Sequence, residues 1–301
     1  MSARPLARLA QVLHHRGPLI FALGGSSTTQ RRNRTSDTDL FAIAGRDQMS
    51  DLVAIAGSFP RADLELRDLD WLDSFCTRLS SYRPSINAGP SPFSFVDLRF
   101  LARVLLGTEI VSHSDLRRRL ESCREPLRVA LATYMSSYYV STFEDVAGLY
   151  FDHRHEDALL VAGELAQRAC LLGLLQIELV DPAPKWSFAI AREGRFPSLT
   201  AAAAAMQQHL GAFGKPTPNI WVQSLLKLAN RLVATGILAA NDEGESAMPS
   251  SPLANSPAVN AGLCVMGVPG FQTLLDVSTN KISVCNRVLL HDFATYSLAT
   301  S

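Results

Sequence analysis

The hydrophobic pattern of this chain changes its period near Ser94, and the change separates a region of expected strands from a long region of expected helices. Before Ser94, short apolar runs at residues 19–23, 38–44 and 62–69 have the length of β-strands, and the third alternates apolar with charged residues. After Ser94, apolar residues recur at helical spacing as far as Gly236. The pattern therefore predicts an α/β (α+β) protein in which a small sheet domain precedes an α-helical bundle.

Small polar residues mark the expected helix starts. Ser94, Ser112 and Thr142 are each followed by an aspartate three residues later, which is the spacing of a capping box. Asp152 is in a position to cap a helix over residues 153–176. We expect these helices to pack as antiparallel neighbours in a bundle.

Composition marks the end of the bundle. Residues 241–260 are rich in Ser, Pro, Ala and Asn, which is typical of a linker. Short apolar runs at 262–268 and 281–290 then predict a short β-rich tail. The expected organisation is a sheet domain at 1–93, a helical bundle at 94–240, a linker at 241–260 and a small β-rich segment at 261–301.

The charges of the chain balance, with 28 basic and 28 acidic side chains. Duplex nucleic acid and anionic membranes attract a basic surplus, so we expect neither as a partner. No apolar run approaches the ~20 residues of a membrane span, and the first apolar stretch is too short for a signal peptide. The cysteines show no Cys-x-x-Cys pair, which argues against a disulfide framework or structural zinc and favours a cytoplasmic protein. We expect the cysteines to be buried in the core. They are Cys76, Cys123, Cys170, Cys264 and Cys285.

The segment from Phe21 to Leu40 combines features that suit a bound phosphate and a metal ion. Asp37 and Asp39 stand two residues apart at the start of an expected strand, so both side chains project from one face of the sheet. Such paired carboxylates are what Mg²⁺ prefers, completed by water and substrate phosphates. Upstream, the turn Gly24-Gly25-Ser26 ends the preceding strand and offers backbone N–H groups and a hydroxyl to an anion.

A third carboxylate is expected from the neighbouring strand at residues 62–69. We take Glu65 as the first choice and Asp63 as the reserve, because the register of the strand decides between them. Three carboxylates at one edge of a sheet can hold metal against a nucleoside triphosphate. The third acid can ligate a second metal ion or accept the proton of an attacking hydroxyl.

These residues resemble a known family. A Gly-Ser pair, a nine-residue gap and Ser-Asp-x-Asp-Leu, with a third acid on a later strand, resemble the nucleotidyltransferase superfamily that includes DNA polymerase β. The resemblance is closest to the antibiotic adenylyltransferases and the small bacterial nucleotidyltransferases. It implies a mixed-sheet catalytic domain followed by a C-terminal helical bundle.

The resemblance also implies roles for individual residues. Asp37, Asp39 and Glu65 would act in catalysis and bind one or two Mg²⁺ ions, with Glu65 as the base or a further metal ligand. The nucleotide, ATP or another NTP, would be bound by Gly24, Gly25, Ser26, Ser36 and Lys185.

The expected activity is transfer of a nucleoside monophosphate, with AMP from ATP as the first candidate, to a hydroxyl of a small molecule such as an antibiotic or a natural-product intermediate. One alternative is a nucleotidyltransferase that modifies a protein or RNA, as in toxin–antitoxin systems. The other is a degenerate member of the family that binds a peptide partner through residues 261–301. His153 and His155 are expected on different faces of a helix start, so we expect no metal site there.

Overall fold

The computed structural model describes residues 17–24, 38–57, 61–84, 91–212, 217–241, 263–268, 271–277, 281–284 and 293–294. The chain forms two compact units. The first contains Met1–Arg83 and Phe93–Ala130, and the second contains Pro84–Pro92 and Leu131–Ser301. We describe each unit by itself.

The first unit is built on a four-stranded mixed sheet. Its strands are β1 (Leu19–Gly24), β2 (Thr38–Ala44), β3 (Ala62–Asp68) and β4 (Thr108–Ser112), in the order β3-β2-β1-β4. β1 is antiparallel to both of its neighbours, whereas β2 and β3 run parallel. The three strands expected from the sequence are confirmed, and β4 is an addition in a region that we expected to be helical.

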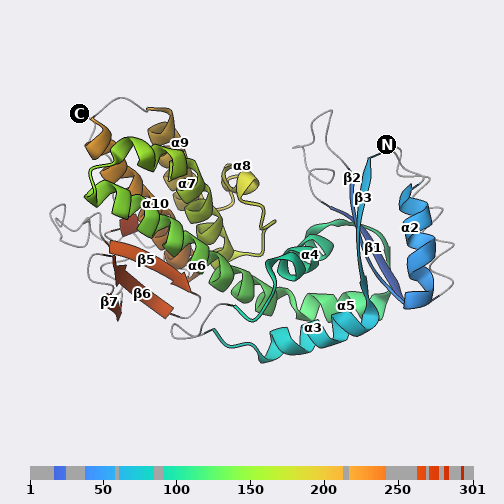
Figure 1. Ribbon diagram of the computed structural model, residues 1–301. Coiled ribbons are helices and arrows are strands. Elements are labelled where there is room, and N and C mark those ends of the chain that lie inside the picture. Colours follow the sequence, from blue (N-terminus) through green and yellow to red (C-terminus); the bar gives the residue numbers. More distant parts are fainter. Residues whose placement is uncertain are drawn as a thin grey trace. The chain divides into compact units, whose positions relative to one another are not determined.

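Helices cover both faces of this sheet (Figure 1). One face forms an apolar core with α2 (Met49–Gly57), in which Leu40 and Ala42 contact the Leu52 region of the helix. The other face packs against α3 (Leu69–Ser81) and α4 (Phe95–Leu106), where the Phe41 and Phe100 rings meet edge to face with centroids 5.9 Å apart. Aromatic pairs of this kind add to the stabilisation that burial provides. The sheet is therefore the middle of three layers.

Only one of the expected helix starts is confirmed. The Ser94 hydroxyl caps α4 by accepting a hydrogen bond from the Val96 N–H at 3.2 Å. The prediction at Ser112 is wrong because that residue ends β4, and α5 (Ser114–Ser122) has His113 at its N-cap.

The predicted starts at Thr142 and Asp152 are also wrong. Thr142 lies inside α6 (Arg124–Phe151), where its hydroxyl donates a hydrogen bond to the Tyr138 carbonyl at 2.9 Å. This is a common way for a threonine to satisfy its hydroxyl within a helix. α7 (His155–Ile177) begins three residues after Asp152, with Arg154 at the N-cap.

Long helices dominate the second unit. Besides α7 and the greater part of α6, they are α9 (Pro197–Gly211) and α10 (Pro218–Ala240), and the short α8 (Ser187–Ala191) precedes α9. α7 and α10 approach so closely that a Cβ atom on Gly236 would lie 2.2 Å from the Gly173 carbonyl oxygen. By length and composition α7 could span a bilayer, but 61% of its most apolar window is buried, as in the core helix of a soluble domain.

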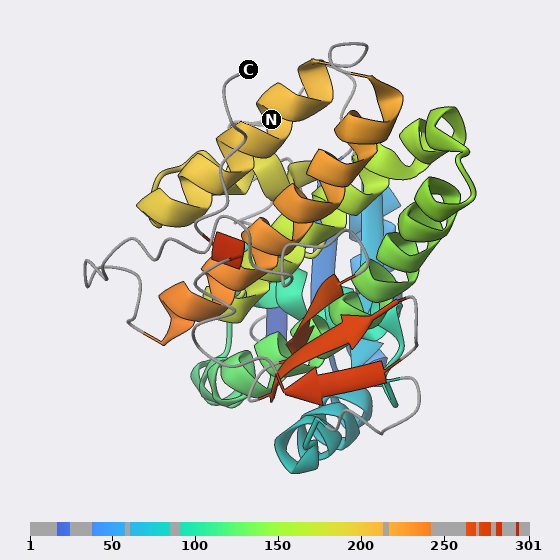
Figure 2. The ribbon, with the colours of Figure 1, turned by 90° about the vertical axis from the view of Figure 1, so that its left-hand side faces the viewer.

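The second unit also contains a three-stranded antiparallel sheet. Its strands are β5 (Leu263–Val268), β6 (Phe271–Asp276) and β7 (Lys281–Val284), in that order. β5 lies against α10 (Figure 2), where the buried Asn230 side chain hydrogen-bonds both the Leu263 carbonyl and the Val265 N–H. The expected α/β class, with a mixed sheet, a helical region and a β-rich tail, is confirmed.

The division between the units differs from the expected boundary at 93/94. The structure divides within α6, between Ala130 and Leu131. The reason is that β4 pairs with β1 and that α4 packs on the same sheet, so both elements belong to the first unit.

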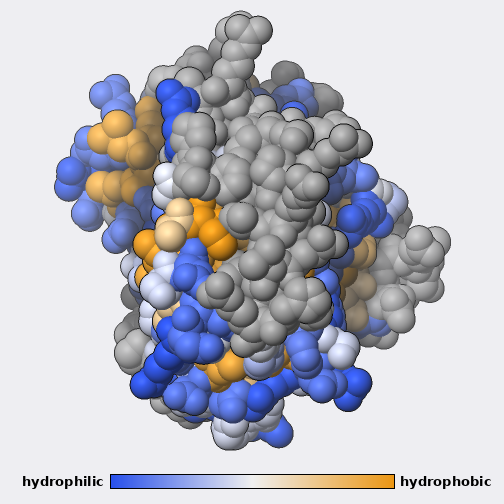
Figure 3. Space-filling view, turned by 90° about the vertical axis from the view of Figure 1, so that its right-hand side faces the viewer, coloured by the Kyte–Doolittle hydropathy of each residue, from blue (hydrophilic) through white to orange (hydrophobic). Residues whose placement is uncertain are grey.

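The coloured surface in Figure 3 is mostly hydrophilic, and hydrophobic residues appear on it in separate areas. Isolated exposed apolar side chains such as Val53 are ordinary on a folded protein.

Candidate functional site

Apart from Lys185, the described part of the expected site lies at one edge of the first unit's sheet. Gly24 is the last residue of β1, Asp39 is the second residue of β2, and Asp63 and Glu65 lie in β3. Four expected site residues fall outside the described residues: Gly25, Ser26, Ser36 and Asp37.

The register of the strands brings two carboxylates level with each other. In the parallel pair of β2 and β3, Asp39 is the partner of Asp63, and in the antiparallel pair of β1 and β2 it is the partner of Gly24. Paired positions in neighbouring strands present their side chains on the same face of a sheet. The Asp39 and Asp63 carboxylates therefore project side by side next to the end of β1. Asp63 is exposed and Asp39 is half-buried.

Glu65 lies one pleat further along β3, level with Phe41, and its carboxylate is held by α4. Arg99 Nη2 is 3.3 Å from Glu65 Oε1, and Arg103 Nη1 is 4.0 Å from the same atom. The Glu65 side chain is only 20% exposed. Two guanidinium groups thus compensate its negative charge, and this makes Glu65 a weaker ligand for a cation.

The sequence reasoning missed Arg99 and Arg103. They stand four residues apart, so they share one face of α4. The Arg103 guanidinium also lies over the Phe41 ring, 5.8 Å from its centroid. The helical spacing of the two arginines was the available signal, but it does not show which strand faces them.

The other acids of residues 63–70 have structural roles. Asp68 caps α3 by accepting a hydrogen bond from the Trp71 N–H at 2.7 Å, and this bond lowers the pKa of the Asp68 carboxyl. Arg46 contacts both Asp68 and Asp70, each at 3.1 Å. Within the described residues, no ion pair involves Asp63. Of these acids, Asp63 is therefore the one most available to a cation.

Lys185 lies in the second unit, in a short 3-10 turn over Pro184–Trp186. Its Nζ atom is 5.2 Å from the centroid of the Trp186 ring, which is a cation–π contact. This contact gives Lys185 a local structural role besides the nucleotide contact that we expected of it.

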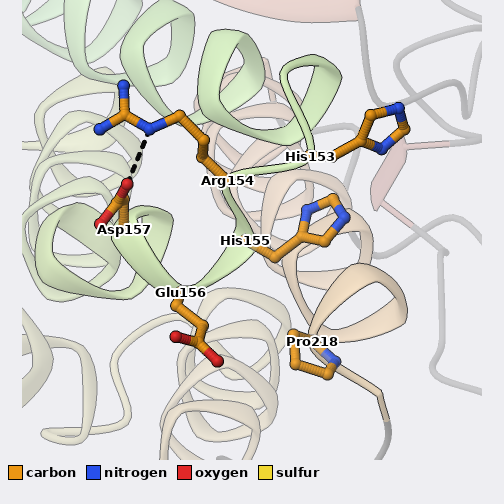
Figure 4. A pocket seen from close by; sticks show the side chains of 6 residues that line it. All are labelled: His153, Arg154, His155, Glu156, Asp157 and Pro218. Atoms are coloured by element: carbon orange, nitrogen blue, oxygen red, sulfur yellow. Dashed lines mark hydrogen bonds and ion pairs between the residues drawn. The ribbon is translucent and has the colours of Figure 1, made fainter.

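A separate cavity of about 330 Å³ lies in the second unit, where α7 and α10 begin. Figure 4 shows that the Arg154 side chain turns away from the two imidazoles toward Asp157, with the two groups 2.7 Å apart. Among the described residues there is no cluster of three metal-capable side chains. The cavity is lined by His153, Arg154, His155, Glu156, Asp157 and Pro218.

Comparison with known proteins shows distant similarity to solved structures only. No family model matches the chain, and no curated protein matches it. Among solved structures it is similar to the crystal structure of a nucleotidyltransferase-like protein from Exiguobacterium sibiricum, with 15% identity over 79% of this chain and 78% of that chain. The TM-score of 0.38 assigns neither an activity nor a substrate. The functional argument therefore rests on the residues of the first unit.

Proposed function

We propose that this protein is a Mg²⁺-dependent nucleotidyltransferase, as the sequence resemblance suggests. The observation that carries the proposal is the strand register, which aligns Asp39 with Asp63 beside Gly24. Asp37 precedes Asp39 by two residues, which is the spacing of one face of a strand.

The donor set fits a hard divalent cation. Carboxylate oxygens are the protein ligands that Mg²⁺ prefers. In nucleotide sites, Mg²⁺ is usually coordinated by one or two carboxylates together with the phosphates of the nucleotide. We assign Asp37 and Asp39 as the metal-binding carboxylates and Asp63 as the third acid, which is a further metal ligand or the base. Asp63 takes the place that we first gave to Glu65, because Arg99 and Arg103 already compensate the Glu65 charge.

The reaction that we propose is an in-line displacement at the α-phosphorus of ATP or another NTP. A hydroxyl oxygen of a small acceptor forms the new P–O bond, and the bond to pyrophosphate breaks. When bound, Mg²⁺ would neutralise charge on the phosphates. The Asp63 carboxylate would accept the hydroxyl proton if it is not itself a metal ligand.

The remaining nucleotide contacts in the proposal come from the sequence. The Gly24-Gly25-Ser26 turn would offer N–H groups and a hydroxyl to the triphosphate, with Ser36 next to Asp37. Lys185 is retained as a candidate phosphate contact. The cytoplasm, with its ATP and its reduced thiols, suits both the reaction and the cysteine pattern.

Binding of Mg·ATP to the purified full-length protein tests the metal site directly. We expect Asp39→Asn and Asp63→Asn to weaken binding at least about tenfold, since each removes a charged ligand. The matched control is Asp70→Asn, which removes an exposed carboxylate paired with Arg46 and should bind as the wild type does. Wild-type affinity in both test variants would refute the proposed site.

Turnover tests the reaction and separates the two candidates for the third acid. The protein is incubated with α-labelled ATP, Mg²⁺ and a panel of hydroxyl-bearing small molecules, and pyrophosphate release and transfer of the label are measured. We expect Asp63→Asn to abolish transfer and Glu65→Gln to retain part of it. The opposite order would return the third role to Glu65. Label on a protein or RNA instead of a small molecule would favour the toxin–antitoxin alternative.

A further inference from the structure

Two buried cysteines of the first unit face each other across neighbouring helices. Cys76 lies in α3, and Cys123 is the C-cap residue that follows α5. They are 6% and 1% exposed, respectively, and both are free thiols. The two thiols interact, and each shifts the pKa of the other.

An ion pair lies one helical turn away from the two thiols. Asp73 precedes Cys76 by three residues on α3, and Arg119 precedes Cys123 by four residues on α5. These spacings put each charged residue on the same helix face as its cysteine. The Asp73 carboxylate and the Arg119 guanidinium are in direct contact, so the two helices are fixed side by side at that level (Figure 1).

The other described cysteines interact with hydroxyl groups and not with a second thiol. Ser187 acts on the pKa of Cys170, and Tyr139 acts on the pKa of Cys264. Both are as deeply buried as Cys123, so they serve as internal controls for burial alone.

We propose that Cys76 and Cys123 are a site of reversible oxidation, at which a small hydroperoxide converts the dithiol to an intramolecular disulfide between α3 and α5. In the first step the Cys123 sulfur attacks a peroxide oxygen. An S–O bond forms, the O–O bond breaks, and water leaves when hydrogen peroxide is the oxidant. The Cys76 sulfur then displaces the hydroxyl of the Cys123 sulfenic acid, which forms the S–S bond and releases a second water.

The surroundings assign the order of the two steps. The interaction with Cys76 lowers the pKa of the Cys123 thiol, and the positive charge of Arg119 acts in the same direction. The pKa of Cys76 is raised by its interaction with Cys123 and by burial. Because the thiolate is the nucleophile, Cys123 reacts first and Cys76 resolves the intermediate.

The disulfide would close a loop that contains α4 and β4. A cross-link of this length removes conformational freedom from the unfolded chain. Oxidation should therefore raise the thermal midpoint of unfolding. This inference is independent of the proposed nucleotidyltransferase activity.

The test uses the reduced full-length protein, treated with hydrogen peroxide under native conditions, alkylated, and digested without reductant. Mass spectrometry should find a peptide pair joined through Cys76 and Cys123, two hydrogens lighter than the separate thiols. Its appearance should raise the thermal midpoint, and dithiothreitol should reverse both changes.

Three variants sharpen the test. Cys76→Ser should stop the reaction at a Cys123 sulfenic acid, which dimedone traps, and Cys123→Ser should give no cross-link. Cys170→Ser should behave as the wild type does. A wild-type protein that keeps its circular dichroism spectrum but forms no Cys76–Cys123 peptide would overturn the proposal, and so would a disulfide that joins either residue preferentially to Cys285.

Discussion

Asn230 offers the sharpest test of how the C-terminal strands are held in the second unit. It is 1% exposed, and its side chain makes three hydrogen bonds. The amide nitrogen donates to the Leu263 carbonyl at 2.5 Å, and the amide oxygen accepts from the Val265 N–H and the Tyr139 hydroxyl, both at 2.9 Å. One side chain of α10 thus joins β5 to α6.

Asn230→Ala removes all three bonds and leaves three partners unsatisfied, of which Tyr139 and Val265 are fully buried. A hydrogen bond contributes about 1 kcal/mol net, and an orphaned buried group costs about 1–3 kcal/mol. We therefore expect a loss of about 3–5 kcal/mol in the free energy of unfolding. Tyr139→Phe removes one donor and leaves the amide oxygen bonded to Val265, so it should cost only about 1 kcal/mol.

Urea unfolding followed by circular dichroism measures both values, and hydrogen exchange at residues 263–268 reports the release of β5. The matched control is Asn241→Ala, which removes a single bond to the Ile237 carbonyl at the exposed end of the same helix. Exchange in β5 should accelerate in Asn230→Ala and remain unchanged in Asn241→Ala. A loss below about 1 kcal/mol in Asn230→Ala would refute the idea that this side chain holds the strands.

Two further predictions concern the helices of the second unit. Gly236→Ala places a Cβ atom 2.2 Å from the Gly173 carbonyl oxygen, so we expect overpacking that costs about 1–3 kcal/mol. This loss should be visible as a lower thermal midpoint. The control is Gly211→Ala, whose Cβ atom meets open space and which should show no such loss. Burial lowers the pKa of His209, so this imidazole stays neutral in the folded protein while the unfolded chain binds a proton below about pH 6.5. Stability should be fully present above that pH and should fall as the pH drops toward the folded pKa. In His209→Gln, the urea midpoint of unfolding should depend less steeply on pH in this range. An unchanged pH dependence would contradict the role given to His209.

The strands that were predicted from the sequence are those in which the local pattern of apolar and polar residues reflects their burial. β1 and β2 are apolar runs that form the core of the sheet, and β3 alternates in the manner of a strand with two different faces. β4 is a five-residue edge strand that shows no such pattern. It exists because β1 offers it hydrogen bonds, and such tertiary pairing cannot be inferred from a local window.

Three of the predicted helix starts were wrong for a related reason. A capping box is a pair of residues that stand three positions apart. It marks a helix start only where the residues before it are not helical. Ser94 meets that condition. Thr142 does not, because the apolar face of α6 continues through it on both sides.

The choice between Asp63 and Glu65 shows where sequence reasoning about this site ends. Both residues belong to the same face of β3, so alternation alone treats them as equal. The parallel register of β2 and β3 separates them by placing Asp63, and not Glu65, level with Asp39. The position of α4 separates them further, because two arginines on that helix lie against Glu65. Both facts depend on contacts between residues far apart in the chain. The residue types therefore indicate the chemistry of the site, whereas its geometry, and with it the role of each acid, follows from the packing of α4 and β3.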